Sequence, residues 1–311
     1  RASGGQSGSP APEKAGAGEG RTAFAESAGY EDVADLAFSA NGRRLAWTAR
    51  KAGGWRVVVE SGGGAAGVEG IEGEAFERVS KLVWTPRGER LAYSVGRGGV
   101  ESVVADGVIG AAYEGVLPGS LTFDASGTHV AYAARRAGAW HVVVGAAEGP
   151  PYEEVEAPCF VGDSSAVAHL ARRGAASFVV LDGHQGPVHA AASEPVLSPD
   201  GKRFLHAAQF GARMVVIDGR ATGGPCGEGK CSPVESRRTL HDVLVGGTLV
   251  FSADGAHTGY VAGRASSREL FLMVDGARAG AFDVEELMAG IVVEPDLAGA
   301  FTGDSKRLAQ W

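Results

Sequence analysis

The sequence lacks features that several protein classes require. No apolar run approaches the roughly 18 residues of a membrane-spanning helix, so we expect no transmembrane segment. The net charge is −8, which disfavours a nucleic-acid partner because contacts to phosphate need a basic surface. The chain starts at Arg1 without a methionine or a signal peptide, and we expect a mature or trimmed form.

Cysteine is also scarce, with three residues in the chain. Cys226 and Cys231 bracket the short loop CGEGKC, and a disulfide between them is our candidate pairing, which favours an oxidising compartment. Two free thiols are the alternative. Because no two further ligands are spaced nearby, we expect no zinc site, and we predict no other metal or cofactor. Cys159 is expected to be a small buried apolar residue.

Glycine, in contrast, is abundant at 49 residues, and hydrophobic residues reach 44 %, which indicates a globular protein. Residues 1–20 are mostly Gly, Ala, Ser and Pro and cannot bury enough surface to offset the entropy of ordering, so we expect a flexible tether there. Such a tether often follows the anchor of an exported lipoprotein. We therefore expect an extracytoplasmic protein, periplasmic or at the cell surface, with a lipid anchor at its N-terminus as one possibility. A linker between two domains of a longer protein is the alternative.

A repeated unit organises the remainder of the chain. Each copy has a short apolar strand, a turn and a second strand. The copies are LAFSANGRRLAW (36–47), LVWTPRGERLAY (82–93), LTFDASGTHVAY (121–132), PVLSPDGKRFLH (195–206) and LVFSADGAHTGY (249–260), with a worn copy at 160–169 and a partial one at 298–310. Turn pairs such as Asn41-Gly42 and Asp200-Gly201 accept the positive φ that tight hairpins require.

Two further strands complete each unit. A β-branched third strand follows the second, as in WRVVVESG (55–62). Each unit ends in a short segment that we call the closing tag and expect to form a fourth strand. Tags occur at 76–79 (FERV), 113–116 (YEGV) and 152–155 (YEEV), with weaker versions at 187–191, 239–243 and 281–287. A unit of about 36–54 residues suits a four-stranded propeller blade.

The number of copies predicts how the ring closes. Seven first-and-second strand pairs occur, but third and fourth strands follow only six of them, and the chain begins with RTAFAES (21–27) and a tag, GYEDV (29–33). We therefore predict an all-β, seven-bladed propeller as a single domain over 21–311, with its last blade closed by these N-terminal strands. Six blades is the alternative, if the worn unit at 160–191 merges with a neighbour.

The run SPDGKRFLH (198–206) resembles the TolB-type, WD40-like repeat of bacterial β-propellers, and the resemblance extends over residues 22–311. It implies the propeller fold. It implies little about activity, because that family includes binding scaffolds, periplasmic assembly factors and non-catalytic domains of peptidases.

Departures from the repeat identify candidate site residues. Five positions after the turn glycine most units carry an aromatic residue, such as Trp47 or Tyr93, but two carry His169 and His206. Adjacent blades could bring these imidazoles together for acid–base work or for a metal; packing in place of the aromatic ring is the alternative. His184 and His189 are expected to be exposed loop residues.

A second departure is an insertion at 220–238, and long loops on rigid scaffolds often carry recognition. Lys230, Arg237 and Arg238 make it basic on an acidic protein, and with His241 they are our candidate binding residues. A tolerated surface insertion is the alternative.

These features favour a non-catalytic scaffold propeller that presents loops to a protein or peptide partner. The alternatives are a propeller enzyme, of hydrolase or lyase type, with a funnel or inter-blade site, and the sensor domain of a larger membrane protein.

Overall fold

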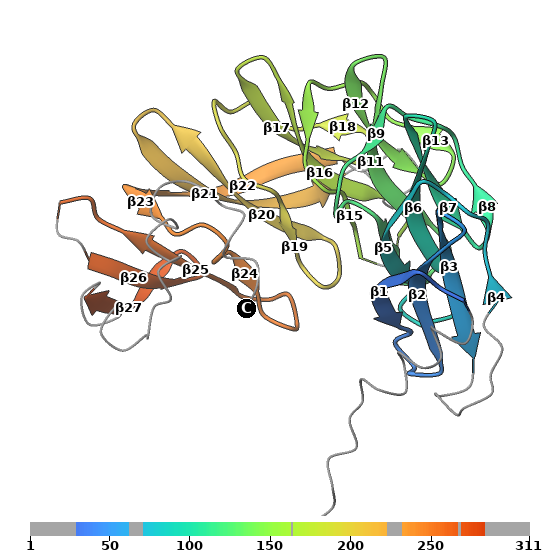
Figure 1. The fold of residues 1–311 in the computed structure, drawn as a ribbon. Coiled ribbons are helices and arrows are strands. Elements are labelled where there is room, and N and C mark those ends of the chain that lie inside the picture. The colour runs from blue at the N-terminus through green and yellow to red at the C-terminus, as the bar shows by residue number, and fades with distance from the viewer. Residues whose placement is uncertain (1–28, 62–70, 163, 223–231, 267–268, 284–311) are drawn as a thin grey trace, which may run out of the picture.

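The computed structural model describes residues 29–61, 71–162, 164–222, 232–266 and 269–283. Within these ranges every helix or strand is a β-strand, and the strands form six antiparallel sheets of four or five members. Figure 1 shows the sheets following one another along an arc, in chain order. None of the described residues forms a helix with the length and apolar character needed to span a membrane. The predicted all-β class and the four-stranded blades are confirmed.

The first three sheets hold the N-terminal half of the arc. The first contains β1 (Asp32–Phe38), β2 (Arg44–Lys51), β3 (Gly54–Ser61) and β4 (Ile71–Glu72). The second contains β5 (Arg78–Trp84), β6 (Leu91–Arg97), β7 (Val100–Ala105) and β8 (Val108–Ile109). In the third, the first strand is broken into β9 (Gly115–Val116) and β10 (Thr122–Phe123), followed by β11 (Val130–Arg136), β12 (Ala139–Val144) and β13 (Ala147–Glu148).

The other three sheets repeat this order. The fourth contains β14 (Glu154–Val155), β15 (Cys159–Phe160), β16 (Val167–Arg173), β17 (Ala176–Leu181) and β18 (His184–Gln185). The fifth contains β19 (Val196–Leu197), β20 (Arg203–Phe210), β21 (Arg213–Thr222) and β22 (Ser232–His241). The sixth contains β23 (Val243–Leu244), β24 (Val250–Phe251), β25 (Thr258–Gly263), β26 (Glu269–Val274) and β27 (Ala277–Asp283).

The turn between the first and second strands has the predicted chemistry. In the fifth sheet the Ser198 hydroxyl donates to Asp200 Oδ1 at 2.7 Å and accepts from the Arg203 amide at 2.9 Å. Gly201 has a φ of 68°, which a glycine adopts without strain. A Cβ at this position would also lie 2.5 Å from the Gly162 nitrogen of the preceding sheet, so the glycine permits close contact between the sheets.

The closing tags are shared between two sheets, which differs from their predicted role as fourth strands. Tyr113 forms a bridge to Glu101 of β7, whereas Gly115 and Val116 pair with β11 of the next sheet. The fourth strand begins earlier, as the two-residue β8 that follows β7. The tag has this double role because it is the segment that leaves the outer edge of one blade and enters the first strand of the next.

The N-terminal tag also enters the first strand of a sheet, since Asp32 and Val33 pair with Arg50 and Ala49 in the first sheet. Residues 21–27 and 298–310, on which the predicted closure of a seventh blade depends, lie outside the described residues. The blade count therefore stays a prediction.

The core lies between neighbouring sheets. One cluster joins Ala46 and Val57 of the first sheet to Tyr93 and Val95 of the second. In the first four sheets the second strand places an alanine directly before its aromatic or histidine residue, and these alanines have no exposed surface: Ala46, Ala92, Ala131 and Ala168. Their small side chains allow the sheets to approach, and the apolar area removed from water between blades stabilises the arc.

Candidate functional site

Pairs of aromatic or imidazole rings recur at the boundaries between sheets. A ring from a tag contacts, edge to face, the ring five positions after the next turn glycine. The centroid distances are 5.1 Å for Tyr30–Trp47, 6.0 Å for Tyr113–Tyr132, 5.8 Å for Tyr152–His169, 5.4 Å for His189–His206 and 5.3 Å for His241–Tyr260. Edge-to-face geometry is the favoured arrangement of such rings. The candidate residues His169, His206 and His241 therefore all occupy ring-packing positions.

His169 is almost completely buried. The residue is 3 % exposed, and neither ring nitrogen has a hydrogen-bond partner among the residues that the structure describes. Burial lowers its pKa from 6.5 to about 3, because the charged imidazolium would lose its hydration. The ring is thus neutral near pH 7, where it packs against Tyr152 as an aromatic residue would.

His206 contacts His189, a residue that we expected to be an exposed loop histidine. His189 is 8 % exposed and its backbone bridges to Ser177 of β17, so that expectation is wrong. The ring of Phe204 stacks on His206 at 5.9 Å. Among the described residues no group of three or more His, Cys, Asp or Glu side chains is arranged to hold a metal ion.

The predicted recognition loop at 220–238 is a strand extension at its base. β21 and β22 continue their pairing to Thr222 and Ser232, so the described part of the insertion is a two-stranded ladder rather than an irregular loop. Lys230, Cys226 and Cys231 lie outside the described residues. The backbone of Arg237 pairs with Asp218, and the Arg238 side chain is exposed.

His241, the fourth binding candidate, is directed into the blade boundary. Its Nε2 lies 3.0 Å from the Tyr260 hydroxyl, and burial lowers its pKa. Of the four binding candidates, only Arg238 and His241 have described side chains, and the structure does not bring them into one cluster.

The hairpins between second and third strands meet the tags on one side of the arc, which we call the hairpin face. There the tag glutamate accepts a hydrogen bond from a hairpin glycine amide of the next sheet. The pairs are Glu77 with Gly98 at 3.1 Å, Glu114 with Gly138 at 3.1 Å and Glu153 with Gly174 at 2.9 Å. Each glutamate thus satisfies a backbone donor that the tight hairpin leaves free.

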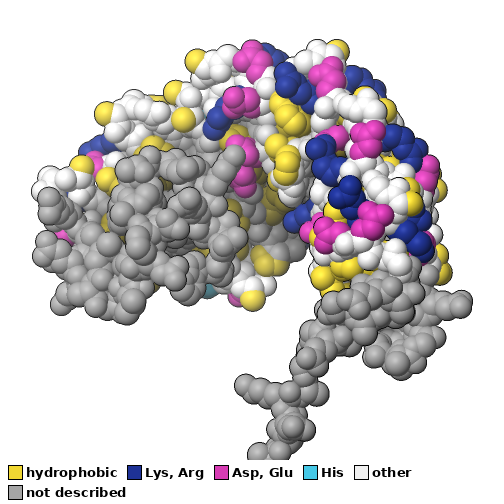
Figure 2. Space-filling model, viewed as in Figure 1, with side chains coloured by type: hydrophobic (Ala, Val, Ile, Leu, Met, Phe, Trp, Pro, Cys, Tyr) yellow, Lys and Arg dark blue, Asp and Glu magenta, His cyan; other side chains and the backbone are white. Residues whose placement is uncertain are grey.

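A cation accompanies each of these glutamates. The guanidinium groups of Arg97, Arg136 and Arg173 lie 4.6, 4.5 and 5.5 Å above the rings of Phe76, Tyr113 and Tyr152. Each guanidinium also donates to the carbonyl just before that ring, at Ala75, Ala112 and Pro151. Stacking of this kind is favourable by about 0.5–1 kcal/mol at exposed sites. Figure 2 shows basic and acidic side chains interspersed over the sheets at the right of the view.

The fifth sheet departs from this charged pattern. Phe210 stands where the arginines stand, four residues after the boundary ring, and Ala190 replaces the tag glutamate. Phe210 is 60 % exposed and Val188 is 59 % exposed. The equivalent arginines reach the residue just before the tag ring, so we infer that the side chain of Phe210 lies on the side of Val188. We call Val188, Ala190 and Phe210 the Phe210 patch. Its signal was present in the sequence, as an aromatic residue at a position that otherwise holds a cation.

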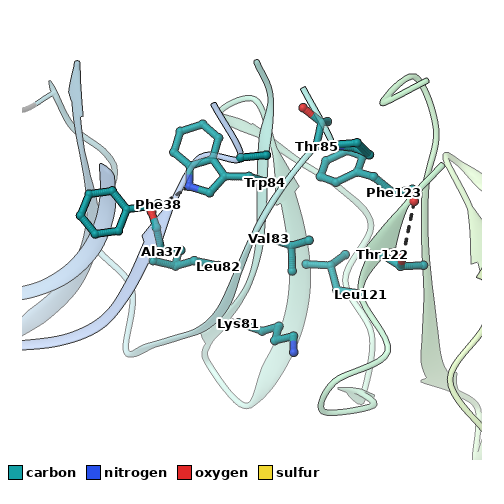
Figure 3. Close-up of a pocket in the computed structure, with 12 residues that line it drawn as sticks. Ala37, Phe38, Lys81, Leu82, Val83, Trp84, Thr85, Leu121, Thr122 and Phe123 are labelled. Carbon is teal, nitrogen blue, oxygen red and sulfur yellow. Dashed lines mark hydrogen bonds between the residues drawn. The ribbon is translucent and has the colours of Figure 1, made fainter. Parts of the chain in front are cut away.

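A hollow opens on the concave side of the arc, along the first strands of the first three sheets. Its volume is about 540 Å³, and it is lined by residues 37, 38 and 40, by 81–86 and by 121–123 (Figure 3). Trp84 closes one side, with its Nε1 donating to the Ala37 carbonyl at 2.9 Å. Lys81 is the only charged residue among those that line it. Nothing in the repeat pattern of the sequence pointed to this hollow.

No family model matches the chain, and no curated protein matches it. Solved structures with a similar fold include a eukaryotic initiation factor, with 13 % identity and a TM-score of 0.46 over 82 % of this chain and 66 % of that one. TolB from Acinetobacter baumannii has 15 % identity and a TM-score of 0.35 over 76 % of this chain and 62 % of that one. The β-propeller domain of the Trilobed protease from Pyrococcus furiosus has 12 % identity and a TM-score of 0.41 over 85 % of this chain and 98 % of that one.

The chain spans less than two thirds of the initiation factor and of TolB. Likenesses at this distance concern the fold and carry no activity over to this chain. The architecture is that of a β-propeller, as the order of the sheets, the tags shared between them and the packing between them indicate.

Proposed function

We propose that this protein is a non-catalytic binding propeller that engages a protein partner through the Phe210 patch. The observation that carries the proposal is the exposed Phe210, at a position where the other hairpins of this face place a cation. Exposed aromatic side chains are enriched at protein interfaces, where burying them supplies much of the binding free energy. The neighbouring hairpins supply the charged surroundings that orient a partner.

Acidic and basic side chains both occur on the elements that border the patch. Arg172 lies 2.9 Å from Glu154 in the fourth sheet, and Arg213 lies 3.5 Å from Asp242 in the fifth and sixth. Because charges of both signs surround the patch, a protein surface of mixed charge fits it better than a polyanion does. These charges would determine the orientation of the bound partner more than its affinity. We also propose that the protein acts outside the cytoplasm, on the composition of residues 1–20 and on the candidate disulfide between Cys226 and Cys231.

The enzyme alternative, a hydrolase or lyase centred on His169 and His206, has less support. The imidazole of His169, with a pKa of about 3, is neutral near pH 7 and a weak base, and its burial keeps it away from the surface where a substrate would bind.

The test is site-specific photo-crosslinking in the source organism. A photoreactive residue replaces Phe210 in one variant and Arg136, the equivalent hairpin position of the third sheet, in the control. The protein captured at position 210 is then purified, and its affinity is measured for the unmodified chain and for Phe210→Arg. We expect capture at 210 to exceed capture at 136, and Phe210→Arg to weaken binding at least about tenfold, as for an interface anchor. Equal capture at both positions, or equal affinity of the variant, would contradict the proposal.

A further inference from the structure

Lys81 is a cation without a described partner at the edge of an apolar hollow. Its side chain is exposed, and it makes no ion pair or hydrogen bond with any of the described residues. Figure 3 shows Lys81 at one end of the hollow, with its amine on the side of Leu121. The remaining lining consists of aliphatic, aromatic and threonine side chains with one proline.

The backbone at Lys81 has an unusual conformation. The pairing of β5 with β6 shifts register between Ser80 and Val83, and Lys81 has a φ of 57°. A bulge of this kind re-aims a side chain. The third and sixth sheets also break their first strands, but there the positive φ falls on Gly119, at 82°, and Gly247, at 72°. A lysine in this conformation is strained where a glycine is not, and retained strain of this kind is often found where a side chain binds a ligand.

We propose that this hollow is a binding site for a small amphiphilic carboxylate, a free molecule with one carboxylate and an aliphatic or aromatic body. The carboxylate pairs with the Lys81 ammonium, and the body lies against Val83 and Leu121. A volume of about 540 Å³ falls within the range of small-molecule sites, which supports a free molecule over a folded partner. Charge-assisted hydrogen bonds to an ammonium are stronger than neutral ones, so a carboxylate is selected over a neutral group.

Asp35 is the charged residue at the equivalent bulge of the neighbouring strand, β1. Its φ is 45°, and its bulge lies between Ala34 and Leu36. Asp35 does not line the hollow, and no ion pair joins it to Lys81 in the described structure. Its negative charge would repel a carboxylate at longer range, so Asp35→Asn is a control that should leave binding unchanged or tighten it.

The experiment is calorimetric titration of the full chain with three probes of similar shape: phenylbutyrate, phenylbutanol and phenylbutylamine. We expect phenylbutyrate to bind about tenfold more tightly than phenylbutanol, and phenylbutylamine to bind most weakly. Lys81→Met should reduce the affinity for phenylbutyrate to that for phenylbutanol. Lys202→Met, which removes an exposed lysine outside the hollow, should leave all three affinities unchanged.

Lys81→Gly is a second variant that guards against misfolding, since glycine accepts the positive φ. It should melt no lower than the unmodified protein and still lose the preference for phenylbutyrate. The proposal would be overturned if phenylbutyrate and phenylbutanol bound with equal affinity, or if no probe bound. It would also be overturned if Lys202→Met lost the preference for phenylbutyrate as Lys81→Met is expected to. Tighter binding of N-acetyl-leucyl-phenylalanine than of phenylbutyrate would also overturn it, because a peptide end would then be the ligand. The outcome is independent of the Phe210 patch, which belongs to other sheets.

Discussion

Replacing His169 with phenylalanine should stabilise the protein, and more so as the pH falls. The folded pKa of His169 is about 3, against an ordinary value of 6.5, so the unfolded chain binds a proton that the folded chain excludes. The titration of His169 therefore takes almost nothing from the unfolding free energy above about pH 6.5 and takes progressively more as the pH falls toward 3. Phenylalanine has a ring of similar size and does not titrate, so the variant loses this part of the pH dependence.

The magnitude follows from the shift. One pKa unit corresponds to about 1.36 kcal/mol, so this group removes about 2 kcal/mol of stability between pH 7 and pH 5. Phenylalanine also removes two buried ring nitrogens that have no hydrogen-bond partner, each of which carries a desolvation penalty of about 1–3 kcal/mol. We expect His169→Phe to be more stable than the unmodified protein by about 1 kcal/mol or more at pH 7 and by about 2 kcal/mol more than that at pH 5.

The assay is urea unfolding of both proteins at pH 7, 6 and 5, with the difference in free energy taken at each pH so that shared carboxyl titrations cancel. His257→Gln is a control of opposite sign. Asp275, 2.7 Å away, raises the pKa of His257, so its contribution is present at acidic pH and disappears as the pH rises through the folded pKa. A difference between His169→Phe and the unmodified protein that is equal at pH 7 and pH 5 would refute the reasoning.

Other predictions test separate parts of the structure. Lys81→Gly should raise the unfolding free energy by about 1 kcal/mol, measured with urea, because it relieves a positive φ. Glu153→Ala should lower it by about 0.5–1 kcal/mol and speed hydrogen exchange at the Gly174 amide that it caps. Phe210→Arg should leave the unfolding free energy within about 0.5 kcal/mol, because the side chain is exposed. Thiol titration of the denatured chain without reductant should find one thiol if the Cys226–Cys231 disulfide is present and three if it is not.

Cys159 can be followed in the folded chain in the same titration. Burial raises the pKa of its thiol to about 11, and its Sγ lies 3.4 Å from the Ala168 carbonyl. Because the thiolate is the reactive form, the folded protein at pH 8 should show almost no reaction at this residue.

The turn and strand pattern of this fold could be predicted from the sequence because its causes are local. The Ser198-Pro-Asp-Gly201 turn requires a glycine at positive φ and short polar side chains, and these are visible in the residues themselves. The fourth strands could not be placed in the same way. A two-residue strand such as β8 has too little pattern, and the tag after it divides its pairing between two sheets.

The repeat predicted the positions of the histidines but not the residues that they contact. Counting from the turn glycine located His169 and His206 at boundary-ring positions, but it could not tell that His206 faces His189. The partner comes from a tag of the preceding unit, and its ring is buried at the blade boundary instead of exposed in a loop. Phe210 could have been found by the same count, since the residue four places further on is a cation in the other units.

The sequence by itself determined the all-β class, the repeated strands and the tight turns, because alternation and turn chemistry act over a few residues. Only the tertiary structure decided which rings meet at each boundary, which carbonyls the arginines reach, and that Lys81 borders an apolar hollow. Those features join residues from neighbouring sheets, tens of positions apart in the chain, and they depend on how closely the buried alanines let the sheets pack.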